Sequence, residues 1–130
     1  DTLGYSVIHY ACSSGAIDIL KLLENYKFGA DVNSNSRGGN TSLHFAIRRG
    51  YIKTVRILLE NGANSNARQR KAAASLHIAC SDGNLEATRL LLEKSAIINA
   101  TDTYGRTALH CAGRSRNIAL AEYLLENGAN

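Results

Sequence analysis

The chain has 130 residues, of which 45% are hydrophobic and 20% charged, and it carries a net charge of +4 with a sequence isoelectric point near 9.1. No apolar run reaches the roughly 18 residues that a membrane span needs and no signal peptide is visible, so we expect no membrane-spanning helix. Three cysteines are an odd and sparse set, so we expect free thiols and an intracellular protein, cytoplasmic or nuclear.

The four histidines recur at nearly one period along the chain. The gaps between them are 35, 33 and 33 residues, and they fall at His9, His44, His77 and His110. Alanine stands two positions after every histidine, isoleucine or leucine eight positions after it, and leucine fourteen positions after it. A fixed period of about 33 residues indicates a repeat array, in which each unit packs on its neighbours.

Each histidine closes a similar tetrapeptide, such as Thr41-Ser42-Leu43-His44 and Thr107-Ala108-Leu109-His110, and Asn-Gly-Ala follows at 61–63 and 127–129. This pattern resembles the ankyrin repeat, whose signature runs Asp-x-x-Gly-x-Thr-Pro-Leu-His-x-Ala and later Leu-Leu-x-x-Gly-Ala. The resemblance covers the whole chain. It implies an all-α repeat solenoid in which each unit is a helix-turn-helix pair with a short β-hairpin or loop, stacked into a curved array. The repeats are expected at residues 1–35, 36–68, 69–101 and 102–130.

In the first repeat, Ser6 is expected to begin a helix because its hydroxyl caps backbone N–H groups, and Gly15 is expected to end it. Two extra residues near Tyr26-Lys27-Phe28 predict a longer second helix or a bulged loop. The alternative is a specific contact made by Tyr26 or Phe28.

In the second repeat, Thr41 and Gly50 are expected to begin and end the first helix. Its second helix has an apolar stripe at helical spacing, made by Ile52, Val55, Leu58 and Leu59.

The third repeat departs most from the pattern. Its cap position is Ala74 and its turn glycine is replaced by Ala72, so Ser75 is the alternative cap, one residue late. In the fourth repeat, Arg116 stands where the other repeats have glycine. A left-handed conformation there costs roughly 1 kcal/mol unless Asn117 adopts it instead, so we expect a softer turn.

The four histidines do not predict a metal site. Successive helices in a stack lie about 8–10 Å apart, so the rings cannot converge on one zinc ion. We expect instead that each ring bonds the capping hydroxyl and neighbouring backbone. No catalytic or cofactor-binding motif is present, so we expect no enzyme and no cofactor.

The asparagines at one repeat position, Asn33, Asn66 and Asn99, have two interpretations. They are typical of side chains that bridge adjacent hairpins. They also resemble the positions that asparaginyl hydroxylases modify in ankyrin arrays, since Leu58 and Leu91 stand eight residues before two of them.

By the resemblance, the concave surface of the array consists of the hairpin tips and the outer face of each first helix. Basic residues gather at these positions, whereas acids are few there (Asp1, Asp82 and Asp102). Arginine and aromatic residues are enriched at interface hot spots. The predicted partner-binding residues are Tyr10, Phe45, Arg48, Arg49 and Ile78 at the centre, with Arg37, Arg70, Lys71, Arg106 and Arg114 around them. The alternative is a solubilising surface without a dedicated partner.

These features favour a monomeric, non-enzymatic module that binds another protein, with an acidic segment as the expected partner, acting as a scaffold, adaptor or substrate receptor. The first alternative is nucleic-acid or anionic-lipid binding through the same groove. The second is a targeting or regulatory arm of an enzyme or channel encoded outside this segment. Because both ends fall on repeat boundaries, we expect the chain to be a fragment of a longer array or multidomain protein.

Overall fold

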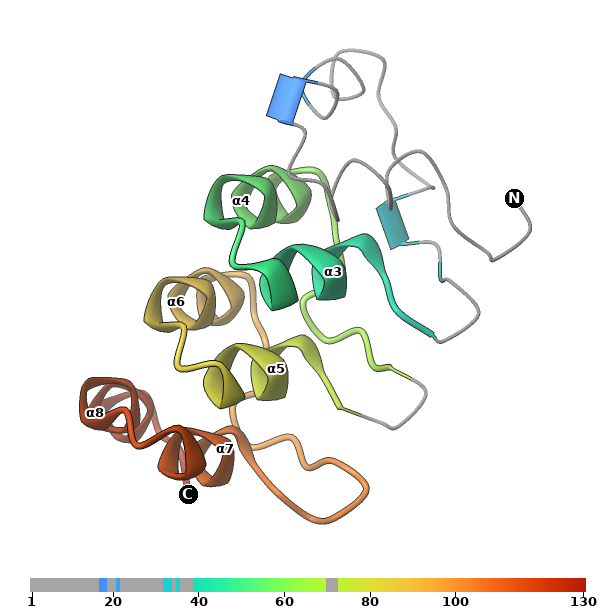
Figure 1. Cartoon of the computed structure of the whole chain (residues 1–130). Helices are drawn as coiled ribbons and strands as arrows, with labels where there is room; N and C mark the ends of the chain where they lie inside the picture. The colour runs from blue at the N-terminus through green and yellow to red at the C-terminus, as the bar shows by residue number, and fades with distance from the viewer. Residues whose placement is uncertain (1–16, 19–20, 22–31, 34, 36–38, 70–72) are drawn as a thin grey trace.

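The computed structural model describes residues 17–18, 21, 32–33, 35, 39–69 and 73–130. These residues form three helix pairs, whose helices are α3 (Ser42–Arg49), α4 (Ile52–Glu60), α5 (Ser75–Ser81), α6 (Leu85–Glu93), α7 (Ala108–Ser115) and α8 (Ile118–Glu126). The pairs stack on one another, and the long loops before α5 and α7 extend to one side of the stack (Figure 1). This confirms the predicted all-α repeat array for these three units. Most of the first repeat lies outside the described residues.

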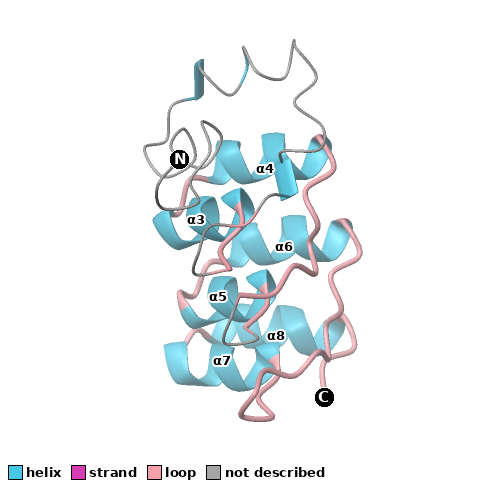
Figure 2. Ribbon diagram, turned by 90° about the vertical axis from the view of Figure 1, so that its right-hand side faces the viewer, coloured by secondary structure: helices cyan, strands magenta, loops and turns pink. Residues whose placement is uncertain are grey.

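The helices form two layers, with α3, α5 and α7 in one and α4, α6 and α8 in the other (Figure 2). The buried face of the second layer follows the predicted stripe, because Val55, Leu58 and Leu91 are fully buried. The alanines two residues after the histidines, Ala46 and Ala79, are also fully buried. Their small side chains let neighbouring helices approach closely, so one core runs through the stack.

The predicted start and end of α3 are confirmed. The Thr41 hydroxyl accepts a hydrogen bond from the backbone N–H of His44 (3.4 Å), and Gly50 ends the helix in the left-handed region at φ 73°. For α5 the alternative cap is wrong. Ala74 occupies the cap position, Ser75 is the first helical residue, and the Ser75 hydroxyl is buried without a hydrogen-bond partner among the described residues.

The turn between α7 and α8 contains a strained residue. Arg116 adopts the left-handed conformation (φ 57°), so Asn117 does not relieve it. Asn117 instead begins α8, where its side-chain oxygen accepts from the backbone N–H of Leu120 (3.0 Å). Its amide group donates to the Gly83 carbonyl of the preceding repeat (2.9 Å). The strained turn is therefore tied to the neighbouring repeat.

Among the described residues, two recurring sets of hydrogen bonds join successive repeats. In the first, each asparagine at one repeat position accepts from a backbone N–H about one repeat later and donates to a carbonyl nearby. The accepted N–H groups are those of Asn64 for Asn33 (2.7 Å), Ile97 for Asn66 (2.8 Å) and Asn130 for Asn99 (2.9 Å). The carbonyls are those of Gly62, Ser95 and Gly128. The bridging interpretation of these asparagines is confirmed.

The second set involves the histidines. In His44, Nδ1 accepts from the Thr41 backbone N–H (2.9 Å) and lies 2.9 Å from the Thr41 hydroxyl, so Nε2 carries the proton that it donates to the Ala67 carbonyl (3.0 Å). His77 makes the same kind of backbone contacts, because Nδ1 accepts from the Ala74 backbone N–H (3.2 Å) and Nε2 lies 3.0 Å from the Ala100 carbonyl, but Ala74 has no hydroxyl to offer. The predicted structural role is therefore confirmed in full for His44, and for His77 only in its backbone contacts. Burial lowers the pKa of His44 to about 4; the bond to Ala67 opposes this effect and the charge of Arg48 adds to it.

Cys80 and Cys111 are buried free thiols, as predicted, whereas Cys12 lies outside the described residues. Burial raises the pKa of Cys80 to about 12, so this thiol is unreactive at neutral pH. Among the described helices, none has the length and apolar character needed to cross a membrane.

Candidate protein-binding groove

A hollow of about 250 Å³ lies on the first-helix layer, beside the long loops. Four of its lining residues lie on or next to α5, and two lie in the loop before α5. The other three come from α3, from the loop before α7 and from α7, one residue each. The lining residues are Arg48, His77, Ile78, Ser81, Asp82, Gln69, Ala73, Arg106 and Cys111. Three of the predicted partner-binding residues, Arg48, Ile78 and Arg106, therefore line one concave site.

The floor of the hollow is apolar. Ile78 is 9% exposed and Cys111, at the same repeat position one unit later, is 3% exposed. Ile78 therefore cannot project as an anchor towards a partner. It offers only the part of its side chain that faces the hollow, where a partner's own apolar group can contact it.

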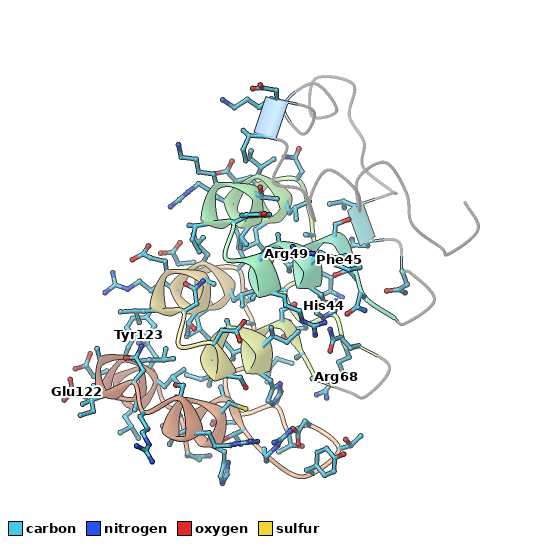
Figure 3. The ribbon with its side chains drawn as sticks, in the orientation of Figure 1. His44, Phe45, Arg49, Arg68, Glu122 and Tyr123 are labelled. Carbon is cyan, nitrogen blue, oxygen red and sulfur yellow. The ribbon has the colours of Figure 1, made fainter. Side chains whose placement is uncertain are left out.

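The end of the hollow nearest the inter-helix turns is charged. Arg48 and Asp82 are both exposed and line the hollow from neighbouring helices, with Ser81 beside them. Partial burial raises the pKa of Asp82, and the positive charge of Arg48 opposes this shift. Arg49 is exposed in the same last turn of α3 (Figure 3). This end of the groove offers two cations and one carboxylate.

At the opposite end, Arg106 is already paired. Its Nε donates to Asp102 (2.7 Å), and a second guanidinium nitrogen lies 2.7 Å from the same carboxylate. Burial by itself would raise the pKa of Asp102, but hydrogen bonds from Arg106 and from the Tyr104 backbone lower it to about 2. The prediction treated Arg106 as part of a basic surface, but a carboxylate neutralises its charge.

An aromatic residue outside the predicted set stands at this hairpin. Tyr104 is 77% exposed, and the guanidinium of Arg106 lies 5.0 Å from its ring centroid. The sequence signal for it was an aromatic residue in the tip of a turn, Asp102-Thr103-Tyr104-Gly105-Arg106. Because Asp102 fixes Arg106 and Arg106 covers the ring, Tyr104 is held in place at the tip of this loop.

The remaining predicted residues divide into two groups. Phe45 is partly buried against the core on α3, and Arg114 is exposed in the last turn of α7. Neither lines the hollow described above. The others, Tyr10, Arg37, Arg70 and Lys71, lie outside the described residues.

The second-helix layer has a different character. A hollow of about 150 Å³ there is lined by both signs of charge, from Arg56, Glu60, Glu93 and Lys94, together with Leu59 and Leu90. Arg89 lies 5.2 Å from the ring centroid of Tyr123 on α8. Figure 3 shows Tyr123 and Glu122 together on α8, on the opposite side of the stack from Arg68. This alternation is typical of a solvated face.

Comparison with known proteins decides the family. A family model of ankyrin repeats in three copies matches residues 1–69 and again residues 69–130. This chain belongs to the ankyrin-repeat family. Ankyrin repeats generally mediate protein–protein interaction, which is the coarse function of this array.

Three curated relatives illustrate how varied ankyrin-repeat proteins are. The array is 36% identical over 62 residues to Inversin of Danio rerio and 34% identical over 62 residues to a probable 26S proteasome regulatory subunit, p28, of Saccharomyces cerevisiae. It is 37% identical over 59 residues to protein phosphatase 1 regulatory subunit 27 of Homo sapiens. The matches cover 48%, 48% and 45% of this chain but only 6%, 27% and 37% of those proteins, respectively.

Proposed function

We propose that this ankyrin array is a non-enzymatic module whose groove binds an extended segment of another protein. The observation that supports this most directly is the hollow beside α5, which combines an apolar floor with exposed charged groups at one end. Its volume of about 250 Å³ is below the roughly 300–1,000 Å³ of small-molecule pockets. It suits a single apolar side chain of a partner better than a small-molecule substrate.

The charges around the hollow define the partner more narrowly. Carboxylates of the partner meet Arg48 and Arg49 at the turn end of the groove, where both arginines are exposed. Asp82 lies beside them and favours a backbone N–H or a basic group next to the apolar anchor. The partner segment is therefore acidic at one end and carries an apolar residue followed by a hydrogen-bond donor.

The groove is suited to binding because hydrogen bonds fix its wall at the loop before α7. Asp102 accepts from the backbone N–H groups of Tyr104 and Arg106 at 2.9 Å each, and its carboxylate also holds the Arg106 side chain. A binding surface that is ordered beforehand loses little conformational entropy when its partner arrives. We further propose that the array acts as a monomer, inside the cell, as part of a longer protein.

Nucleic-acid or anionic-lipid binding is less well supported. Such ligands require several free cations along one track. Here Asp102 neutralises Arg106, and Asp82 contributes a carboxylate beside Arg48. A role as the targeting or regulatory arm of a larger enzyme or channel agrees with the proposed binding function, because the arm would act through the same groove.

The test is a peptide-display selection on the complete chain, followed by binding titrations of the recovered peptides. The variant Arg48→Glu/Arg49→Glu reverses the charge at the turn end of the groove. It should weaken recovered peptides on the order of 10–100-fold, because each lost charge pair becomes a repulsion. The matched control is Lys53→Glu/Arg56→Glu, which makes the same charge change at two exposed positions of α4.

The proposal fails if the selected peptides bind the groove variant as tightly as the parent chain, or if the α4 control weakens them equally. Binding of short RNA or anionic vesicles in separate titrations, with no acidic peptide recovered from the selection, would support the alternative. Far-ultraviolet circular dichroism of both variants establishes that they keep the fold.

A further inference from the structure

The C-terminal ends of the three first helices carry charges whose sign alternates along the stack. Arg48 and Arg49 lie in the last turn of α3, and Asp82 directly follows α5. Arg114 lies in the last turn of α7. All four residues are exposed. From repeat to repeat, the order of charge at this edge of the groove is therefore positive, negative, positive.

These charges belong to turns that adjoin one another. Helix α3 packs on α5 and α5 on α7, and the turns that leave these helices follow one another along the stack (Figure 1). At the second junction the Asn117 amide donates to the Gly83 carbonyl (2.9 Å), and a β-carbon at Gly83 would lie 3.8 Å from the Ser115 hydroxyl. Because Asp82 precedes Gly83 and Arg114 precedes Ser115, the carboxylate and the second cationic position lie on neighbouring turns.

The charged groups of this row are available to a partner. Within the described part of the chain, the ion pair is that of Arg106 with Asp102, and the row takes no part in it. The exposure of Arg114 is a property of its repeat position, because Arg48 and Ser81 stand at the same position and are exposed although a following repeat packs on α3 and on α5. A ligand can therefore reach all three turns.

The spacing of the row matches that of an extended peptide. Packed helices lie about 8–10 Å apart, and an extended chain rises about 3.3 Å per residue, so one repeat corresponds to about three residues of a partner. A segment that runs along the row and places an apolar side chain in the hollow next to Asp82 thus meets one charged turn at about every third residue.

We propose that the groove takes an extended protein segment whose charged residues follow the order acidic, basic, acidic at about every third position, with the basic residue opposite Asp82. This inference rests on the proposed function and specifies the partner of the same groove. Because the order reads the same from either end, it holds for both directions of the bound segment. A segment with the same charges in another order places like charges opposite each other at two of the three turns.

Parallel selections from one random peptide library test the charge order. The complete parent chain should recover peptides with an acidic residue about three positions to either side of a basic one. The variant Asp82→Lys should recover peptides with an acidic residue at the central position instead. The matched control is Glu86→Lys, which makes the same charge change at an exposed position in the first turn of α6, outside the lining of the groove, and should select as the parent does.

A second variant tests the far end of the row. Arg114→Glu should recover peptides in which one outer acidic residue is replaced by a basic one, whereas Arg56→Glu, at an exposed position of α4, should not. In titrations of the parent-selected peptides, Asp82→Lys and Arg114→Glu should each weaken binding roughly 3–10-fold at low salt, because one exposed charge pair becomes a repulsion. Circular dichroism establishes that each variant keeps the fold.

The outcomes separate this inference from the proposed function. If the recovered peptides depend on Arg48 and Arg49 but bind Asp82→Lys and Arg114→Glu as tightly as the parent chain, the charge order is wrong and the proposed function stands. The charge order is also wrong if the basic residue of the peptides has no fixed position relative to the acidic ones. If no recovered peptide depends on Arg48 and Arg49, the proposed function fails and this inference fails with it.

Discussion

The buried histidine of α3 makes the stability of the array dependent on pH. Burial holds the pKa of His44 at about 4 in the folded chain, against 6.5 for an unperturbed histidine. Below pH 6.5 His44 therefore binds a proton in the unfolded chain but not in the folded chain, and the free energy of unfolding falls as the pH drops. The loss levels off near pH 4, where the folded form also becomes protonated.

The size of this loss follows from the two pKa values. One pKa unit corresponds to about 1.4 kcal/mol, so the full difference is about 3 kcal/mol. Integrating over the accessible part of the range gives a loss of about 2 kcal/mol between about pH 7.5 and about pH 5. This is a large share of the stability of a small domain, which is typically about 5–15 kcal/mol.

The variant His44→Gln isolates the effect. Glutamine is a favoured residue at this helix position, where its side chain can still reach back to the Thr41 backbone N–H, but it does not titrate. Urea denaturation followed by circular dichroism is measured at several pH values for the parent chain, His44→Gln and the control Lys53→Gln. The lysine is exposed, so its replacement should preserve the parent's pH dependence.

The expected result is that His44→Gln is less stable than the parent at neutral pH but loses about 2 kcal/mol less on acidification to about pH 5. If the parent and His44→Gln lose the same stability, His44 is not the group that resists protonation and the reasoning is wrong. Nuclear magnetic resonance titration of the His44 ring gives an independent check of its folded-state pKa.

Three other predictions concern stability. Thr54→Val should raise the free energy of unfolding by about 1 kcal/mol, because the buried Thr54 hydroxyl has no hydrogen-bond partner among the described residues. Thr88→Val should lower it by about as much, because the Thr88 hydroxyl donates to the Asn84 carbonyl at 2.9 Å. Urea midpoints for the two variants should move in opposite directions. Arg116→Gly should raise the free energy of unfolding by roughly 0.5–1 kcal/mol, because glycine relieves the left-handed strain; an unchanged urea midpoint would contradict this. Asp102→Asn should remove the loss of stability that the parent chain shows as the pH falls from about 4 towards 2, since Arg106 and the loop backbone hold the folded-state pKa of Asp102 below its unfolded-state value. Thermal melts across this pH range should show a smaller fall in Tm for Asp102→Asn than for the parent chain.

The repeated features of the fold were predictable because the same physical requirement recurs in every unit. The period of the histidines, the capping threonine at Thr41 and the small residue at Ala46 each serve a local need that the sequence displays directly. The roles of His44 and Asn66 also followed, since a buried or turn-forming polar side chain needs partners and the backbone of the next unit supplies them.

The groove was less predictable, because its chemistry depends on which side chains meet across different repeats. The sequence identified Arg48 and Arg106 as basic residues of one surface but could not show that only Arg106 has a carboxylate partner. It could not show the exposure of Tyr104, which depends on the hairpin conformation. At α5, Ser75 satisfied the sequence rule for a cap, yet Ala74 occupies the cap position.

These local pairings change what the net charge of +4 means for binding. A groove with uniform positive charge attracts any polyanion and discriminates poorly. In this array Arg48 and Arg49 remain available, Asp82 lies next to them, and Asp102 cancels Arg106. A partner with carboxylates along its whole length would be repelled at Asp82, whereas a partner with one acidic end would not. Under the proposed function, discrimination would therefore depend on where the charges of a partner lie rather than on how many it carries, and the evenly spaced phosphates of nucleic acids would meet Asp82 as well as the arginines.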